Sequence, residues 1–259
     1  MNVVLIGSGN LATNVGRALK DNGHAILEVY SRKMHNAKKL ADILDAKKYT
    51  DKLDDVSSAA DIYVIAVVDS ALENVIDTLC PSRKDRLFVH TAGSMPISVF
   101  EGKAQRYGIL YPLQTFSKGR EVDFKKIPCF IEGNSKQTES EIESLCKDIF
   151  GSVRIVPSDK RKYLHLAAVF GCNFVNHCFA LCEQILNDAD IPFEVMLPLI
   201  QETVDKVKVM SPRKAQTGPA VRYDKNVMNK HLGLLKSKEM SDIYKLMSKS
   251  IHDMSSGLM

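Results

Sequence analysis

The residues with the clearest chemical meaning stand near the start of the chain. The segment GSGNLA, from Gly7 to Ala12, has the spacing Gly-x-Gly-x-x-Gly/Ala and follows an apolar run. The first glycine permits a tight turn, the second lets a pyrophosphate approach the backbone, and Ala12 lets a helix pack closely on a sheet. The start of that helix adds free N–H groups and positive potential. We predict a dinucleotide site contacted by Gly7, Ser8, Gly9, Asn10 and Leu11; the alternative is a glycine turn that binds nothing.

A second informative position lies about twenty residues later, where another apolar run ends in Ser31-Arg32-Lys33. NAD-binding units carry an Asp or Glu here, which accepts hydrogen bonds from the adenosine ribose, whereas a 2′-phosphate needs donors. Arg32 can stack on adenine and pair with the phosphate, and Ser31 can donate a hydroxyl hydrogen bond. The sequence therefore favours NADP(H) over NAD(H). The alternative is a solvated basic strand end.

Two further strand ends are expected to border the cofactor, because ligands of open α/β sheets lie beyond the carboxyl ends of the strands. The segment AVVDSAL contributes Val67 to the cofactor site and Asp69, which we interpret as a helix cap. The segment VHTAGS places polar and small residues where a nicotinamide or a substrate could lie: His90, Thr91, Gly93 and Ser94. His90 fits either a buried, hydrogen-bonded histidine or a group at the reaction centre.

A polar stripe crosses an otherwise apolar segment further along the chain. At about 100° per residue, one band of a helix would hold His165, Val169, Cys172, Asn173 and Asn176. Buried polar groups need partners, so a purely structural stripe of this kind would be costly. His165 is thus a candidate general acid, with Asn173 orienting a substrate oxygen or nitrogen. A histidine satisfied by backbone or by a dimer partner fits equally.

The long loop SPRKAQTGPAVRYDKN offers hydroxyl, guanidinium and carboxylate groups, and loops of this length inside compact domains are often functional. Thr217 and Arg222 are candidate substrate ligands, since Arg222 could clamp a carboxylate. A pairing of Arg222 with Asp224 that merely braces the loop is the favoured alternative. Cys178 and Cys182 share a helix face but lack further ligands, so we predict no metal site.

Short apolar runs that alternate with amphipathic stretches must position these residues. They predict strands at 3–7, 25–31, 61–69, 86–93, 107–113, 128–133 and 152–157, and helices at 11–23, 36–46 and 139–151, the last ending at Gly151. After Pro157 the pattern is helical, with starts at Ser158-Asp159 and at Pro192. We predict a Rossmann-like, doubly wound, mostly parallel α/β domain over 1–156, followed by an all-helical domain over 157–259.

Composition narrows the class of protein. The 259 residues carry a net charge of +4 with scattered basic residues, which suits anionic small molecules better than nucleic acid. Six cysteines without a Cys-x-x-Cys pair indicate reduced thiols, and hence a cytoplasmic protein. The first residues enter a strand without a charged leader, and two asparagines and His177 interrupt the longest apolar stretch. We therefore expect neither a signal peptide nor a membrane span.

Several segments, in order, resemble one known family: HTAGSMPISVF, YPLQTFS, YLHLAAVFGCNF, PLIQETV, TGPAVRYD and the pair His231-Leu232. The chain is similar over nearly its whole length to NADP-dependent oxidoreductases that join a Rossmann-like domain to a C-terminal domain of unknown function, DUF2520. The resemblance implies a fold like that of pyrroline-5-carboxylate reductase and, more distantly, the β-hydroxyacid dehydrogenases. It also implies a homodimer formed through the C-terminal helices.

One feature of the more distant relatives is missing. β-Hydroxyacid dehydrogenases carry a Lys and, one turn later, an Asn on the first helix of the second domain, whereas here Lys162 is followed by Tyr163, Leu164, His165 and Leu166.

We predict an NADP(H)-dependent oxidoreductase that reduces a small carbonyl or imine compound between its two domains. The alternative is a regulatory or scaffold protein that binds NADP(H) without catalysis.

Overall fold

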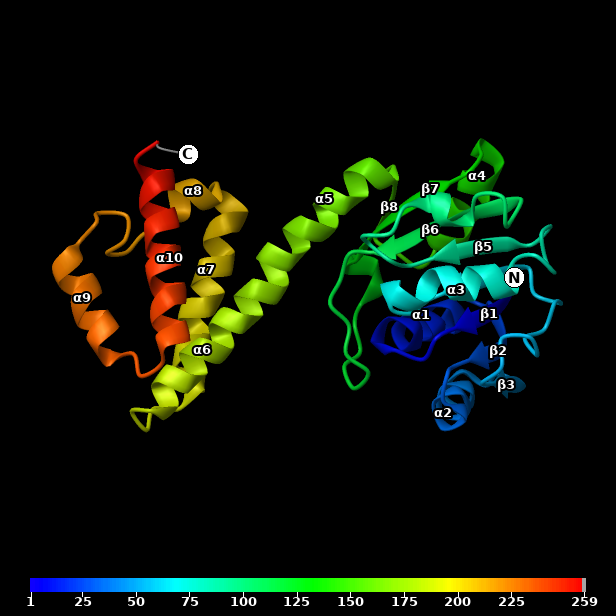
Figure 1. Ribbon diagram of the computed structural model, residues 1–259, viewed down its shortest axis with the longest axis horizontal. Coiled ribbons are helices and arrows are strands. Elements are labelled where there is room, and N and C mark those ends of the chain that lie inside the picture. The colour runs from blue at the N-terminus through cyan, green and yellow to red at the C-terminus, as the bar shows by residue number, and fades with distance from the viewer. Residues whose placement is uncertain (258–259) are drawn as a thin grey trace. The chain divides into compact units, whose positions relative to one another are not determined.

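The computed structural model describes residues 1–257, and its N-terminal part is built on one eight-stranded sheet (Figure 1). The strand order is β3-β2-β1-β4-β5-β6-β7-β8, and every pairing is parallel except that of β6 with β7. The strands are β1 (Asn2–Ile6), β2 (Ala25–Tyr30), β3 (Lys48–Thr50), β4 (Ile62–Ile65), β5 (Leu87–His90), β6 (Arg106–Pro112), β7 (Pro128–Gly133) and β8 (Ser152–Ile155). The predicted Rossmann-like, doubly wound, mostly parallel sheet is confirmed.

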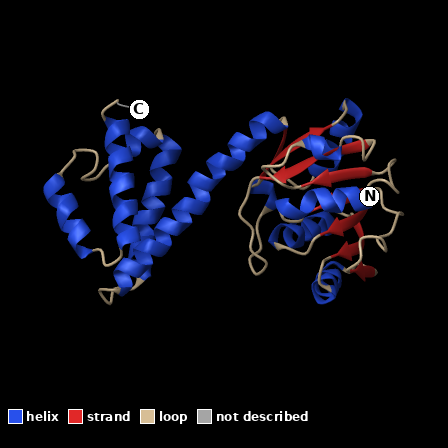
Figure 2. Cartoon of the chain, viewed as in Figure 1, coloured by secondary structure: helices blue, strands red, loops and turns tan. Residues whose placement is uncertain are grey.

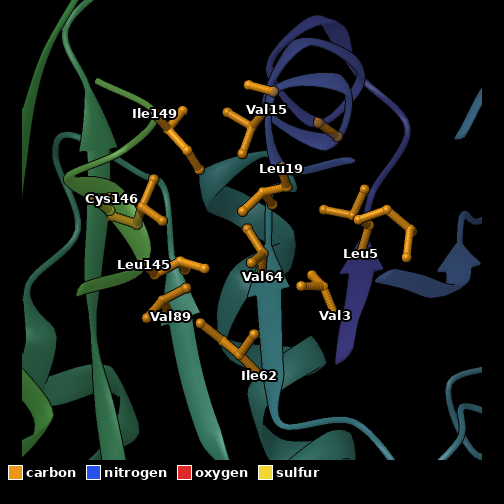
Figure 3. Close-up of a cluster of buried hydrophobic side chains, with 14 of the residues drawn as sticks. Val3, Leu5, Val15, Leu19, Ile62, Val64, Val89, Leu145, Cys146 and Ile149 are labelled. Carbon is orange, nitrogen blue, oxygen red and sulfur yellow. The ribbon is translucent and has the colours of Figure 1, made fainter. Parts of the chain in front are cut away.

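Alternating side chains of the central strands enter two separate cores. In β1, Val3 and Leu5 lie in one core with α1 (Asn10–Asp21), α2 (Met34–Leu44) and α4 (Lys136–Cys146), while Val4 and Ile6 lie in the other with α3 (Asp69–Leu79). Figure 3 shows part of the first core, where Val15 and Leu19 of α1 meet the sheet. Because both faces are buried, the strands read as continuous apolar runs, as expected of parallel sheets.

The helices of this region are α1 (Asn10–Asp21), α2 (Met34–Leu44), α3 (Asp69–Leu79) and α4 (Lys136–Cys146), with 3₁₀ turns at Ile97–Phe100 and Phe124–Lys126. The predicted helix end at Gly151 is wrong, because α4 already ends at Cys146. Gly151 instead donates its N–H to the carbonyls of Phe124 and Ile127, and a Cβ there would lie 2.0 Å from the Lys125 oxygen. The strand β3, which has only three residues, was not predicted.

One long helical segment, Ser158–Asn187, follows the sheet. It consists of α5 (Ser158–Ala168), a π-helical stretch (Val169–Phe174) and α6 (Val175–Asn187). Bonding from i to i+5 places an extra residue in the turn, so the uniform 100° spacing behind the predicted polar stripe does not hold across residues 169–174. The shared face proposed for His165, Asn173 and Asn176 stays a prediction.

The chain divides into two compact units, Met1–Cys172 and Asn173–Met259. The second contains helices only within its described residues (Figure 2). After α6 come a 3₁₀ turn (Phe193–Met196), α7 (Leu197–Val209), α8 (Pro212–Ala215), α9 (Lys225–Leu234) and α10 (Lys238–Ser255). The predicted helical C-terminal region is confirmed. Pro192 precedes a 3₁₀ turn before α7 begins, and the loop at 211–226 contains the short helix α8.

The segment Ser158–Asn187 also has the length and composition of a membrane span, with a mean hydropathy of 1.4 over its most apolar window. Such a helix equally suits a soluble protein in which another surface covers it. Basic residues occupy its first turns, at Lys160, Arg161 and Lys162, and the expectation that the protein does not enter a membrane stays a prediction.

Candidate functional site

The glycine turn lies at the carboxyl end of β1, where the chain order of the sheet reverses between β2 and β4. Gly7 has φ +121°, and a Cβ there would lie 2.2 Å from the Ala66 carbonyl oxygen, so a larger residue is excluded. Gly9 precedes α1, and a Cβ at this position would point into open space. The absence of a side chain at Gly9 thus leaves the N-terminus of α1 accessible to an anionic group.

The end of β2 lies directly beside this turn. The Ser8 and Ser31 hydroxyl oxygens are 2.7 Å apart, so a hydrogen bond joins the two segments that were predicted to bind the cofactor. Ser31 is buried, whereas Arg32 and Lys33 are exposed and have no ion-pair partner among residues 1–257. Two unpaired cations and two hydroxyls therefore border the glycine turn.

A cavity of about 620 Å³ opens at this place. Its lining comprises Gly7, Ser8, Gly9, Tyr30, Ser31, Arg32, Lys33, Asn36, Leu53, Ala66, Val67, Val68, Ala71, Asn74, Val75 and Lys118. Seven of the predicted cofactor residues line it: Gly7, Ser8, Gly9, Ser31, Arg32, Lys33 and Val67. The lining combines cations with apolar side chains and, within the described part of the chain, contains no carboxylate. An anionic ligand with an apolar ring system fits this composition.

The remaining predicted cofactor residues lie outside that lining. Asn10 and Leu11 form the start of α1, directly after the turn. Thr91 is buried at the end of β5, and its backbone N–H and its hydroxyl both donate to the Ile65 carbonyl. These contacts position the end of β5 next to β4, so Thr91 has a structural role in this arrangement.

Asp69 does not cap a helix, so its predicted role is wrong. Val68 occupies the N-cap position of α3, Asp69 is the first helical residue, and no side chain caps the helix. The Asp69 carboxylate instead accepts a hydrogen bond from the Ser94 hydroxyl. Both side chains are exposed, so this bond links the loops that follow β4 and β5 at the rim of the candidate site.

A second group of polar side chains gathers further along the same edge of the sheet. The Tyr111 hydroxyl, at the end of β6, lies 3.2 Å from Nδ1 of His165, and the two rings meet edge to face. Gly93 lies between them, because a Cβ there would be 2.6 Å from the His165 Nδ1 and 2.8 Å from Tyr111. Within the described residues, the His165 Nε2 has no hydrogen-bond partner. Burial raises the pKa of Tyr111, although the charge of Arg161 opposes this shift, so the phenol stays protonated near neutral pH.

A buried ion pair holds this part of α5 to the sheet. Arg161 is 1 % exposed and contacts the Glu132 carboxylate at 2.7 Å, while its other terminal nitrogen donates to the Met95 carbonyl. Ser158 donates to Glu132 and accepts from the backbone N–H of Ile97 at 2.9 Å. A charge buried this deeply must be paired, so these contacts fix the position of α5, and hence of His165.

His90 is fully buried at the end of β5. Its Nδ1 accepts from the Ala92 N–H at 3.2 Å, its Nε2 lies 3.4 Å from the Pro96 carbonyl, and its ring stacks on Phe100. Burial, with a contribution from Arg161, lowers its pKa to about 3, so the imidazole is neutral at physiological pH. These contacts indicate that His90 stabilises the loop that contains Gly93 and Ser94.

Three predicted site residues lie in the second unit, and each is exposed: Asn173, Thr217 and Arg222. Arg222 does not pair with Asp224 in the described structure. The Asp224 carboxylate caps α9 by accepting from the Val227 N–H at 3.2 Å. The bracing pair that was favoured from the sequence is therefore wrong, and the Arg222 guanidinium is unpaired among residues 1–257.

Sequence reasoning missed Tyr111, Asn36 and Lys118. Tyr111 lies at a strand end that was predicted, and the rule that ligands bind beyond the carboxyl ends of strands could have indicated it. Asn36 lies one turn after Lys33 on α2, which a helical projection could have shown. Lys118 belongs to a loop more than eighty residues from Ser31, and only the folded chain brings it to the cavity.

This fold and cavity define a dinucleotide-binding protein of the Rossmann type. Residues 2–93 match the family model described as NADP oxidoreductase, coenzyme F420-dependent, and residues 127–251 match the domain of unknown function DUF2520. A solved structure from Bacteroides fragilis, provisionally described as an NADP oxidoreductase, is 46 % identical with a TM-score of 0.93, covering 97 % of this chain and 98 % of that one. The chain therefore belongs to the family of NADP oxidoreductases that carry DUF2520, as its segments predicted.

More distant solved structures share the fold. The reductive aminase of Aspergillus terreus, in complex with NADPH and ethyl-5-oxohexanoate, is 14 % identical with a TM-score of 0.75, over 98 % of this chain and 97 % of that one. A pyrroline-5-carboxylate reductase from Coxiella burnetii is 18 % identical with a TM-score of 0.60, over 99 % and 98 %. No functionally curated protein shows significant similarity to the sequence.

Proposed function

We propose that the protein is an NADP(H)-dependent oxidoreductase that reduces a small carbonyl or imine compound. The observation that carries this proposal is the cavity at the glycine turn, where Ser31, Arg32 and Lys33 replace the acidic residue of NAD-binding proteins. A 2′-phosphate carries two negative charges near neutral pH, and two unpaired cations with a neighbouring hydroxyl complement it. The fit at Gly7 and Gly9 supports a bound pyrophosphate at the start of α1.

The protein would supply orientation and a proton, while bound NADPH supplies a hydride to the carbonyl or imine carbon. His165 is the proposed general acid, delivering a proton to the substrate oxygen or nitrogen as the carbon is reduced. Its Nδ1 faces the Tyr111 hydroxyl, which leaves Nε2 available to the substrate. Tyr111 is a positioning residue in this proposal, because its protonated phenol holds the imidazole ring in one orientation.

The contacts of His90 favour its structural alternative over a catalytic role. Both ring nitrogens face backbone groups, and a pKa of about 3 makes the imidazole a poor proton donor at neutral pH. Ser94, at the rim beside Asp69, remains a candidate substrate ligand. Asn173, Thr217 and Arg222 also stay predictions, and the unpaired guanidinium of Arg222 supports a role in binding a substrate carboxylate.

We also propose a homodimer formed through the C-terminal helices. Among the described residues of the second unit only Ala220 and Ser248 are buried, while many large apolar side chains are exposed, including Leu199, Val204 and Leu246. Exposed apolar surface of this extent is typical of interfaces between proteins, and this supports the proposed dimer. A cytoplasmic location stays a prediction; the buried or half-buried positions of most of the six free cysteines are compatible with it.

Two measurements test the proposed function. Calorimetric titration should show tighter binding of NADPH than of NADH, and NADPH oxidation should be followed across keto acids, cyclic imines and aldehydes. Turnover of any of these substrates supports the reductase. Tight NADPH binding without turnover on the whole panel would favour the regulatory or scaffold alternative, and binding of neither dinucleotide would refute both.

A further inference from the structure

The loop between β6 and β7 reaches the cofactor cavity from a distant part of the chain. In Figure 1 it is the green loop that extends from the sheet beside α1. Phe116 anchors it, because this side chain is buried in the first core and stacks on Phe124 with ring centroids 5.8 Å apart. Phe124 in turn packs on Phe150 at 5.4 Å. The middle of the loop is thus fixed to the core through an aromatic cluster.

A buried amide ties the next loop residue to α1. Asn14 is 3 % exposed, and its Nδ2 donates to the Asn10 carbonyl at 2.8 Å and to the Ser117 carbonyl at 3.2 Å. The two hydrogens of one amide group therefore join a helix turn to a loop 103 residues away in sequence. Buried polar groups are retained where their hydrogen bonds are satisfied, and this one fixes Ser117 beside the first turns of α1.

The hydrogen bond from Asn14 to the Ser117 carbonyl, which we call the latch, helps to fix the position of the next residue, Lys118. Its side chain lines the same cavity as Gly7, Ser8 and Gly9, and it has no ion-pair partner among residues 1–257. Together with Arg32 and Lys33 it makes the lining strongly cationic. Asn14 lies one turn after the start of α1, so its hydrogen bond holds Ser117, the residue before Lys118, beside the first turns of this helix.

We propose that Lys118 binds the pyrophosphate of the dinucleotide and that Asn14 positions it there through Ser117. This inference rests on the proposed function, since it needs a dinucleotide in the cavity. The β6–β7 loop would then act as a strap across the phosphate groups, with its ammonium group opposing the N-terminus of α1. An ammonium ion needs no special geometry to neutralise a phosphate, so a flexible lysine suits this role.

The first test is calorimetric titration of the Lys118→Ala protein with NADPH and with NADH. We expect both affinities to fall by a similar factor, about fivefold to tenfold for a charged contact at a partly solvated site, and the salt dependence of binding to become weaker. Arg120→Ala is the matched control, because this cation lies two residues further along the loop and outside the cavity lining. It should bind both dinucleotides like the parent.

The latch has its own test. Asn14→Ala should retain α1, since alanine favours helices, yet lower both affinities by part of the Lys118 effect. The double variant should bind no more weakly than Lys118→Ala alone, because Asn14 acts through that side chain. Trypsin should cleave after Lys118 and Arg120 faster in Asn14→Ala than in the parent, and NADPH should slow cleavage of the parent.

The possible outcomes separate this inference from the function on which it rests. Parent-like affinities of Lys118→Ala for both dinucleotides would overturn the strap alone. A loss confined to NADPH would assign Lys118 to the 2′-phosphate and overturn the pyrophosphate contact. A parent protein that binds neither dinucleotide would refute the proposed function and the strap together.

Discussion

The two units of this protein bury their apolar residues to very different extents. The first places alternating strand residues in two cores, and side chains such as Val4, Leu5 and Ile76 are inaccessible to solvent. In the second, Ala220 and Ser248 are the only buried residues among those described. A sheet covered by helices on both faces completes its own core, whereas a few helices with apolar sides need a further surface. This difference is the basis of the proposed homodimer.

The same contrast extends to the polar residues. In the first unit several candidate groups are joined by side-chain hydrogen bonds, as with Ser8 and Ser31, or Tyr111 and His165, although Arg32 and Lys33 are exposed. In the second, Thr217 and Arg222 lie exposed in the loop between α8 and α9. Preorganised groups are the ones that can bind or catalyse without further ordering. The first unit therefore holds the assembled candidate chemistry, and the predictions below test this division.

The largest expected effect concerns assembly. Sedimentation at micromolar concentration should give twice the mass of one chain, because the second unit leaves its apolar side chains uncovered. Leu246→Glu and Leu199→Glu, both at exposed positions, should weaken the dimer by introducing a charge into an apolar interface. Tyr49→Glu, an equally drastic change at an exposed position of the first unit, should leave the mass unchanged. If the parent protein sedimented as a monomer, this result would contradict the proposed homodimer.

The next effect concerns the proposed acid. His165→Gln should lower turnover about a hundredfold or more while leaving NADPH affinity intact, since glutamine retains a polar head but cannot donate a proton as imidazolium does. Single-turnover rates with an identified substrate provide the measurement. His177→Gln, which alters an exposed histidine of the second unit, is the matched control.

Tyr111→Phe separates positioning from proton donation. It should lower kcat with little change in KM and shift the pH profile, because the His165 ring loses the hydroxyl beside Nδ1. If the His165→Gln protein instead turned over at nearly the parental rate, His165 would not be the proton donor. The proposal that the first unit supplies the catalytic acid would then be contradicted.

A smaller effect concerns cofactor selection, which we assign to Arg32 and its neighbours in the first unit. Arg32→Ala should weaken NADPH binding by about 1–3 kcal/mol, the range for a hydrogen bond to a charged group, and should barely affect NADH. Lys39→Ala, which removes an exposed cation of α2 outside the cavity lining, is the control. Equal losses for both cofactors in a calorimetric titration would contradict the 2′-phosphate assignment.

The smallest effect concerns acid stability. The pKa of His90 is lowered to about 3 in the folded protein, while an unfolded histidine titrates near 6.5, so the unfolded chain binds the extra proton between these values. The contribution of the neutral His90 imidazole to the free energy of unfolding is therefore fully present above about pH 6.5, and it is lost as the pH falls. At pH 5.5 the loss is about 1.4 kcal/mol. Urea unfolding of the parent and of His90→Asn at pH 7 and 5.5 should show this part of the pH dependence only in the parent.

The sequence by itself determined much of the first unit. The apolar run before Gly7, the spacing of the glycines and the basic residues after Tyr30 are local signals, and they predicted the strand, the turn and the kind of cofactor. They succeed because each strand of a parallel sheet is buried on both faces and because turn geometry depends on neighbouring residues. The seven predicted strands all occur, and only the three-residue β3 was missed, since so short a run has no distinct periodicity.

The tertiary structure decided which polar groups meet. The π-helical stretch at Val169–Phe174 departs from the uniform spacing of 100° per residue that the sequence analysis assumed, and no pattern in the sequence marked it. Tyr111 reaches His165, and Lys118 reaches the glycine turn, only because the sheet aligns its strand ends and Asn14 holds a distant loop. Local propensity fixes elements, but contacts between residues far apart depend on packing, which the order of residues alone does not reveal.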